Sequence, residues 1–226
     1  LALLCHCVRG LRGEGIAELR GLPLVPLRSG GWARFGAPSD APLLVCAEGE
    51  EGLFAAHPQL MVDAAVSPEL QQALSAVATS KQTSVRHFSA ALIPALLPCV
   101  LPAQWRGCEL VQLAREEAGE HSGEARDGCG PTVEWLLQLW GVLGAQHSQV
   151  SLSELHGWPV LPSRCGHAYA LPEHGLRASR ILELEGVPEA LSNALEQCGC
   201  LALHSAVNRS HPGLRTYVHQ PTARGV

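Results

Sequence analysis

Cysteine and histidine are the residues of this chain with the greatest capacity for chemistry, and several of them lie close together in the sequence. Nine cysteines and eleven histidines occur among 226 residues. The close groups are Cys5-His6-Cys7, Cys165-Gly166-His167 and Cys198-Gly199-Cys200. Thiolate and imidazole bind zinc well, but paired cysteine ligands usually have two residues between them, and these have one. Burial in apolar segments explains Cys198 and Cys200 without a metal, so we expect no metal ligand and no cofactor.

The linear motifs of covalent catalysis are missing from the sequence. No Cys-x-x-Cys turn opens a helix, and the nearest match to a G-x-S-x-G elbow, GEHSG at 119–123, has its serine one residue late. Acidic residues cluster at 48–51 and 116–127, where a solvent-exposed surface explains them. We therefore expect no catalytic residue. Two alternatives stay open, a fragment of a hydrolase or thiol enzyme whose catalytic groups converge only in space, and a small metal-bearing module.

Two arginines, Arg28 and Arg164, stand at the same place in a repeated segment. GLPLVPLRSGGWARF at Gly21–Phe35 matches GWPVLPSRCGHAYAL at Gly157–Leu171 without a gap, at a constant offset of 157 − 21 = 136. Arginine forks fit carboxylates and phosphates, so the two residues could bind an anion. A residue repeated together with its turn more often serves the turn itself. We expect Arg28 and Arg164 to have this structural role or to contact a protein.

Tryptophan often anchors protein interfaces, and the chain has five. Four of them lie within apolar patterns that favour the core, namely Trp32, Trp135, Trp140 and Trp158. Trp105 lies between Gln104 and Arg106 after a proline-rich segment. We therefore expect Trp105 to be exposed, as a candidate protein contact.

The repeated segment predicts the same local structure twice. An apolar strand leads to a tight turn at Gly30 or Gly166 and a second strand returns, which is a hairpin. Pro23 and Pro26 in the first strand indicate an edge strand or the entry to one, because proline cannot donate to a strand ladder. An apolar helical stripe follows each hairpin, over 66–77 and over 187–198, at an offset of 191 − 70 = 121. The predicted fold class is α+β (mixed α/β), with two related hairpin-plus-helix units in which apolar helices pack on small sheets.

Composition divides the chain into four parts. Residues 1–114 are the expected first repeat unit, and 131–205 are the second, which opens with a helix that is apolar on all sides. Residues 115–130 are rich in glycine and charge, which predicts a flexible linker. Residues 206–226 carry no acidic residue and are expected to form a loose tail. The short apolar start without a methionine indicates a cut within a longer protein.

Charge, hydropathy and cysteine usage limit the partners and the compartment. The net charge of −5 gives no basic excess for a nucleic-acid backbone. No run of about 18 apolar residues predicts a membrane helix. The odd number of cysteines and their mostly apolar neighbours indicate reduced thiols. We therefore expect a cytoplasmic protein that binds neither nucleic acid nor membrane.

Taken in order, these segments resemble the repeat regions of the sacsin family. The similarity rests on ELRGLPLVPLRSGGWARF, LIPALLPCVLPAQW, EWLLQLWGVL and LHGWPVLPSRCGHAYAL, and it covers about Glu18 to Leu203. The resemblance implies a segment of a very large multi-repeat protein, in which a GHKL-type ATPase module precedes long α/β repeat regions. The ATPase motifs are not found in their strand–loop–helix context, since Asp127-Gly128-Cys129-Gly130 lies in the predicted linker. ATP chemistry is therefore not transferred to any residue of this chain.

The resemblance also implies a function, because the family is linked to chaperone action and protein quality control. The sequence therefore predicts a non-catalytic repeat segment of a large sacsin-like chaperone or scaffold protein. Its expected partners are other proteins, either heat-shock chaperones or client proteins, or neighbouring repeats of the same chain.

Overall fold

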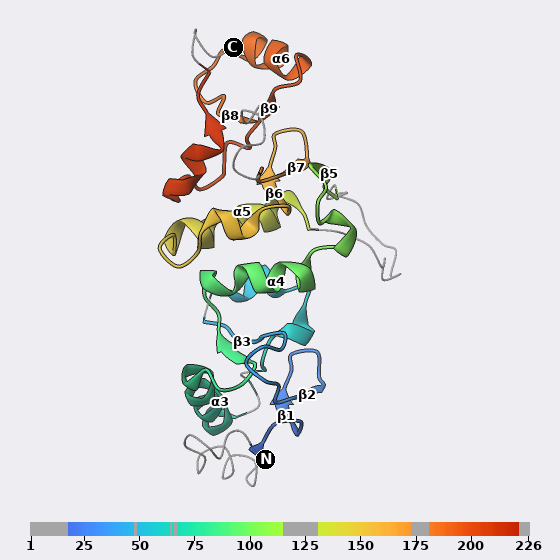
Figure 1. The fold of residues 1–226 in the computed structure, drawn as a ribbon, viewed down its shortest axis with the longest axis vertical. Coiled ribbons are helices and arrows are strands. Elements are labelled where there is room, and N and C mark those ends of the chain that lie inside the picture. Colours follow the sequence, from blue (N-terminus) through green and yellow to red (C-terminus); the bar gives the residue numbers. More distant parts are fainter. Residues whose placement is uncertain are drawn as a thin grey trace. The chain divides into compact units, whose positions relative to one another are not determined.

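The chain is mixed α+β and consists of two compact units, Leu1–Val100 and Leu101–Val226. The computed structural model describes residues 18–47, 49–63, 65, 67–114, 131–172 and 181–221. The predicted linker at 115–130 and the Cys5-His6-Cys7 group lie outside these residues. Helices and small sheets occur in both units (Figure 1), which confirms the predicted fold class.

In the described part of the first unit, two pairs of short strands form two small sheets. The strands are β1 (Pro23–Pro26), β2 (Trp32–Arg34), β3 (Leu43–Val45) and β4 (Val85–His87). β1 and β2 are the antiparallel arms of the first hairpin, and β3 and β4 pair in parallel. An extended segment links the two sheets, since Val62 bridges Leu27 after β1 and Met61 bridges Leu44 in β3.

Helix α3 covers the strands of the first unit. The helices here are η1 (Glu51–Phe54), η2 (Pro58–Leu60), α3 (Pro68–Ser80), η3 (Ala90–Leu92) and α4 (Ile93–Val100). α3 begins as the sequence predicts, because Ser67 Oγ accepts a hydrogen bond from Leu70 N–H at 3.1 Å and Pro68 needs no partner in the first turn. Its apolar face joins a core that contains Val25, Phe35, Val62, Leu70, Leu74, Val77 and Val85. Burial of each such leucine stabilises the unit by about 1.5–3 kcal/mol.

The second unit has two three-stranded sheets among its described residues. The strands are β5 (Leu110–Gln112), β6 (Pro159–Pro162), β7 (His167–Ala170), β8 (Ile181–Leu182), β9 (Leu201–Ala202) and β10 (Val218–His219). The second hairpin lies in an antiparallel sheet of order β5-β7-β6. The other sheet is parallel, in the order β10-β8-β9.

Helix α5 packs on the second hairpin. The helices of this unit are η4 (Ala103–Trp105), α5 (Val133–Ala145), η5 (Leu152–Leu155), α6 (Glu189–Gln197) and η6 (Pro212–Thr216). Trp140 of α5 is 0% exposed and donates from Nε1–H to the Val160 carbonyl of β6 at 2.7 Å. Figure 1 shows α5 lying beside β6. The helix that the sequence predicts to be apolar on all sides therefore buries Trp140 against the second hairpin.

The two hairpins have the same register, residue for residue. Pro26 pairs with Trp32 in the first, and Pro162 pairs with Ala168 in the second, so both members are displaced by 162 − 26 = 168 − 32 = 136 positions. Each hairpin has a register irregularity at the corresponding place, before this pair. The predicted repeat is thus a repeat of three-dimensional structure as well as of sequence.

The match continues into the strands that follow. Ser163 after β6 bridges Leu203, just as Leu27 after β1 bridges Val62. β8 is the middle strand of its sheet and pairs in parallel with β10 on one side and β9 on the other. β3 has the same surroundings, with β4 on one side and the parallel bridge to Met61 on the other. β8 therefore corresponds to β3, β10 to β4 and β9 to Met61. Hairpin, middle strand and two flanking strands therefore form the common framework of the two units.

The helices do not follow the repeat in the way the sequence predicts. α6 lies between β8 and β9, which is the place of η1 and η2 in the first unit. α3 lies later, between Val62 and β4, and η6 takes that place in the second unit. The shared offset of 121 is a coincidence of spacing, because any amphipathic helix carries the same three-and-four pattern. Hairpin and helix are both present in each unit, but the helices occupy different connections.

The unit boundaries also differ from the predicted ones. Residues 101–114 belong to the second unit, because β5 pairs with β7. Residues 206–221 are not a loose tail, since β10 pairs with β8 and Val207, Leu214 and Tyr217 are buried. Both segments are held by strand pairing across many residues of sequence, which local composition does not reveal.

The strands that contain the prolines are edge strands of their sheets, as predicted, since β1 pairs with β2 alone among the described strands and β6 ends the order β5-β7-β6. Pro26 C=O accepts from Asp63 N–H at 2.9 Å, and Pro162 C=O accepts from His204 N–H at 2.9 Å. Each bond belongs to an isolated bridge just past the end of the strand, Leu27 with Val62 or Ser163 with Leu203. Proline lacks only the donor, and these positions use its acceptor.

Candidate functional site

The repeated arginines begin the turns of the two hairpins, and their backbones make the same contact. Arg28 N–H donates to Met61 C=O at 3.0 Å, and Arg164 N–H donates to Ala202 C=O at 3.2 Å. Met61 and Ala202 hold corresponding places next to the middle strands of the two units. The backbone bond therefore ties each hairpin to the neighbouring strand.

The arginine side chains are placed differently. The Arg28 guanidinium bonds the Glu51 carboxylate of η1, and this bond raises the pKa of Arg28. Arg164 is exposed and makes no ion pair with any described residue. Glu196 of α6, in the connection equivalent to that of Glu51, lies instead 3.8 Å from Cys165 Sγ. The backbone contact is common to the two turns, and the ion pair is not.

A small cavity lies beside the Arg28–Glu51 pair and is also lined by Cys46, Met61 and Gln71. Its volume is about 10 Å³, enough for the centre of a single water molecule. Burial, and after it the neighbouring carboxylates, raise the pKa of Cys46 to about 11. The thiol is therefore protonated at neutral pH and a poor nucleophile. The cavity suits neither a small-molecule ligand nor thiol chemistry.

The described cysteines are unpaired thiols without a metal-binding arrangement. They are Cys46, Cys99, Cys108, Cys165, Cys198 and Cys200. Among the residues that the structure describes, no group of three or more histidine, cysteine or acidic side chains could hold a metal ion. Cys198 is exposed rather than buried, because α6 ends at Gln197 and the backbone turns at Gly199 with a φ of +82°.

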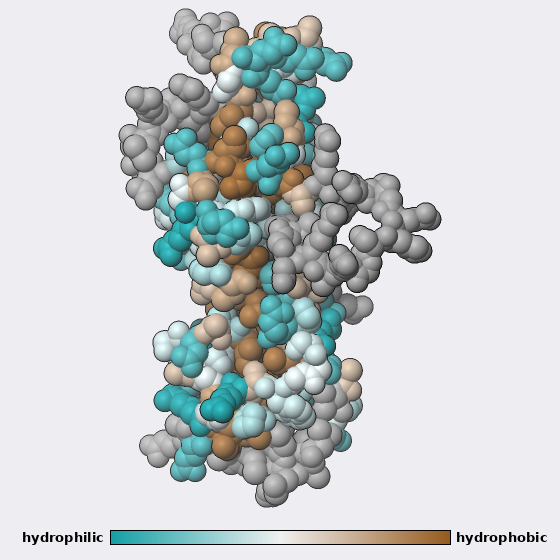
Figure 2. Space-filling model, turned by 90° about the vertical axis from the view of Figure 1, so that its right-hand side faces the viewer, coloured by the Kyte–Doolittle hydropathy of each residue, from teal (hydrophilic) through white to brown (hydrophobic). Residues whose placement is uncertain are grey.

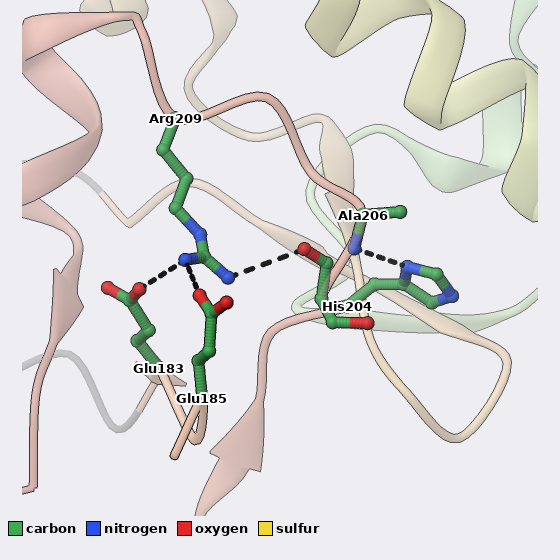
Figure 3. A network of polar contacts seen from close by, with 6 residues as sticks. Glu183, Glu185, His204, Ala206 and Arg209 are labelled. Carbon is green, nitrogen blue, oxygen red and sulfur yellow. Dashed lines mark hydrogen bonds and ion pairs between the residues drawn. The ribbon is translucent and has the colours of Figure 1, made fainter.

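A polar network around Arg209 joins two segments of the second unit (Figure 3). The Arg209 guanidinium forms ion pairs with Glu183, at 2.5 Å, and with Glu185, both just after β8. It also lies 3.4 Å from the Ser205 carbonyl oxygen, as a donor. Within the turn at 204–206, Ala206 N–H donates a hydrogen bond to His204 Nδ1 at 3.2 Å. The network fastens the segment after β9 to the segment after β8.

The tryptophans are distributed differently from the prediction. Trp105, which we expected to be exposed, is partly buried in η4, whereas Trp32 of β2, expected in the core, is 50% exposed. Trp140 and Trp158 are buried as predicted, and Trp135 is partly buried. Trp32 is therefore the tryptophan best placed to contact another protein.

The exposure of Trp32 was not predicted from the sequence, although its neighbour Arg34 indicates it. Arg34 stands two residues further along the same strand, so the two side chains share one face, and the charged residue marks that face as exposed. Within the described residues, the large apolar side chains that are exposed are Leu22, Trp32, Leu110 and Leu191. Figure 2 shows apolar residues at the surface of both units among hydrophilic ones. The candidate site is therefore a set of exposed apolar positions, of which the first hairpin carries two.

The helices that the structure describes include none with the length and apolar character needed to cross a membrane. Comparison with protein-family models, with curated proteins and with solved structures finds no match for this chain.

Proposed function

We propose that this chain is a non-catalytic repeat segment of a sacsin-like chaperone or scaffold protein, which binds other proteins or neighbouring repeats in the cytoplasm. The observation that carries the proposal is the ungapped sequence repeat, built twice as the same hairpin with the same register. Internal structural repeats are found in proteins that present extended binding surfaces.

The residues that the two copies share are architectural. Glycine, proline and arginine recur at the turns, where the arginine backbone bonds the next strand in both units. The residue after each arginine is a hydroxyl in one copy and a thiol in the other, since Ser29 in the first turn corresponds to Cys165 in the second. Burial raises the pKa of the Cys165 thiol, which makes it a poorer nucleophile. A repeated framework without an identical reactive group favours a scaffold over an enzyme.

Two further features support protein partners and the compartment. Trp32 and Leu22 on the first hairpin are 50% and 45% exposed, and exposed aromatic residues are enriched at protein interfaces. The cavity beside Arg28 is too small for a cofactor or metabolite. The unpaired thiols are those expected in a reducing compartment.

A test of chaperone action uses the purified chain Leu1–Val226 with a reporter enzyme that aggregates on heating. We expect light scattering by the reporter to fall by about half or more at equimolar chain without nucleotide, because exposed apolar surface binds unfolded segments. An equal mass of an unrelated folded protein is the control. Scattering that does not change, or changes only with ATP, would contradict the proposal.

A further inference from the structure

β2 and β7 hold corresponding positions in the two units but have different neighbours. β7 lies between β6 and β5, whereas β2 pairs with β1 alone among the described residues. The outer edge of β7 is therefore filled, and no described strand lies along the corresponding edge of β2, which is called the open edge below. An open strand edge offers unpaired N–H and C=O groups to another chain.

The hydrogen bonds of the first hairpin show which backbone groups face this edge. Gly31 C=O accepts from Leu27 N–H, and Phe35 N–H donates to Leu22 C=O, both toward β1. Because backbone groups of a strand alternate in direction, the N–H and C=O of Trp32 and the N–H of Arg34 point away from β1. No described residue accepts or donates to them.

The side chains also differ between the two edges. Trp32 is 50% exposed, whereas Ala168 at the corresponding place in β7 is 0% exposed. Arg34 is exposed and makes no ion pair with a described residue. An aromatic side chain and a free cation thus lie on the open edge strand.

The strand that fills the edge of β7 shows what chemistry suits this geometry. β5 runs antiparallel to β7, and Ala170 N–H donates to Glu109 C=O at 3.0 Å. Transferred by the repeat offset of 136, this contact falls on Arg34 N–H. An acidic residue at the start of an incoming strand would then lie opposite the Arg34 side chain, as a favourable cross-strand pair.

We propose that the open edge of β2 binds an extended peptide strand of another protein, with an acidic residue followed by apolar residues and no proline, as in ELVQL of 109–113. The strand runs antiparallel to β2 and packs beside Trp32. This inference rests on the proposed function and names its binding surface. The mode is strand addition, in which backbone bonds supply affinity and side chains supply selectivity.

The test is a fluorescence anisotropy titration of the full chain with a fluorescein-labelled peptide, acetyl-ELVQLA. We expect saturable binding. A methyl group on the valine nitrogen should abolish it, because in β5 the Val111 backbone faces Ala168. The same methyl group on the glutamine nitrogen, which faces away, should reduce binding far less.

Two variants of the chain test the same edge from the other side. Arg34→Pro removes the outward N–H and should weaken peptide binding by about tenfold or more. Arg34→Ala keeps the N–H and loses only the charge pair, so a loss of about threefold is expected. Circular dichroism and thermal unfolding of both variants check that the hairpin is still folded.

Several outcomes would overturn the inference. Equal loss with Arg34→Pro and Arg34→Ala would mean that charge alone binds the peptide. A dimer of the free chain that Arg34→Pro dissociates would assign the edge to a second copy. Binding that appears only after removal of residues 1–17 would assign the edge to the chain itself.

The inference and the proposed function can fail separately. Absence of peptide binding by a chain that still suppresses reporter aggregation overturns the edge site and leaves the chaperone proposal intact. Edge-specific peptide binding by a chain that does not suppress aggregation supports the edge site and removes the chaperone proposal.

Discussion

The two hairpins share a backbone and differ in what lies against them. The second has β5 along its outer edge and the fully buried Trp140 of α5 on β6, and all four residues of β6 are buried. In the first, Pro23 is exposed and Trp32 is half exposed. The same local sequence pattern therefore specifies the turn and register, while elements far away in sequence decide whether the hairpin is core or surface.

The largest expected effect comes from Trp140 of α5, which packs on the second hairpin, compared with Trp32 in the first hairpin. Trp140→Ala removes a fully buried ring and its bond to Val160 C=O, and should lower the free energy of unfolding by about 3–5 kcal/mol. Trp32→Ala, in the exposed hairpin, should cost less than about 1 kcal/mol. Urea unfolding followed by circular dichroism measures both. Equal losses would show that the exposed hairpin is as tightly packed as the buried one.

The turn glycines should respond alike, because the backbone is what the copies share. Gly30 and Gly166 have φ values of +84° and +74°, and no atom lies within 4 Å of an added Cβ at either place. Alanine at each should therefore cost about 1–2 kcal/mol from backbone conformation alone. Gly31→Ala is the matched control, since Gly31 has no positive φ and its nearest neighbour atom is 3.9 Å away. A loss confined to one of the two turns would contradict their equivalence.

The thiol near the first turn should make folding sensitive to alkaline pH. The pKa of Cys46 is raised from its ordinary value of 9.0 to about 11, so below pH 9 the thiol is protonated in both folded and unfolded chains. Between these values the unfolded chain releases the proton and the folded chain keeps it, so the free energy of unfolding falls as pH rises.

The measurement compares urea unfolding of wild type and Cys46→Ala from pH 7.5 to 10.5. The free energy of unfolding of Cys46→Ala should fall less over this range than that of the wild type, because the variant lacks this thiol. Cys165→Ala, in the second turn, is a comparison at a more exposed thiol. The pKa of Cys165 is also raised, first by burial and then by Glu196, but the residue is exposed, so its replacement should change the slope less. Identical slopes for wild type and Cys46→Ala would contradict the burial of this thiol.

Local signals in the sequence predicted the hairpins and the start of α3, and long-range pairing escaped them. Gly30 and Ser67 fix a turn and a helix start through their own backbone and side-chain chemistry. The pairing of β5 with β7 joins residues more than 50 positions apart, and no local pattern encodes it. This long-range pairing decides whether a neighbouring strand covers the edge of a hairpin. The candidate site therefore depends on it as well.

The misplaced helices and tryptophans have the same physical origin. The apolar stripes of α3 and α6 look alike because every amphipathic helix repeats its apolar residues at intervals of three and four, whatever its place in the fold. The apolar neighbours of Trp32 suggested burial, yet exposure depends on whether another strand covers that face. Trp105 lies among polar neighbours and is partly buried in η4. Periodicity predicts which face of an element is apolar, and the partner of that face comes from tertiary structure.

The smallest expected effect concerns the repeated arginines, whose side chains distinguish the two turns. Arg28 pairs with Glu51 at a partly exposed position, so a double-mutant cycle with alanine at both should give a coupling of about 0.2–1 kcal/mol. The matching cycle of Arg164 with Glu196 should give no measurable coupling, since no ion pair joins them. Both backbones keep their bonds to Met61 and Ala202 in these variants, so register should survive. Equal coupling in the two turns would mean that an acidic partner, and not only the backbone contact, is part of what the repeat preserves.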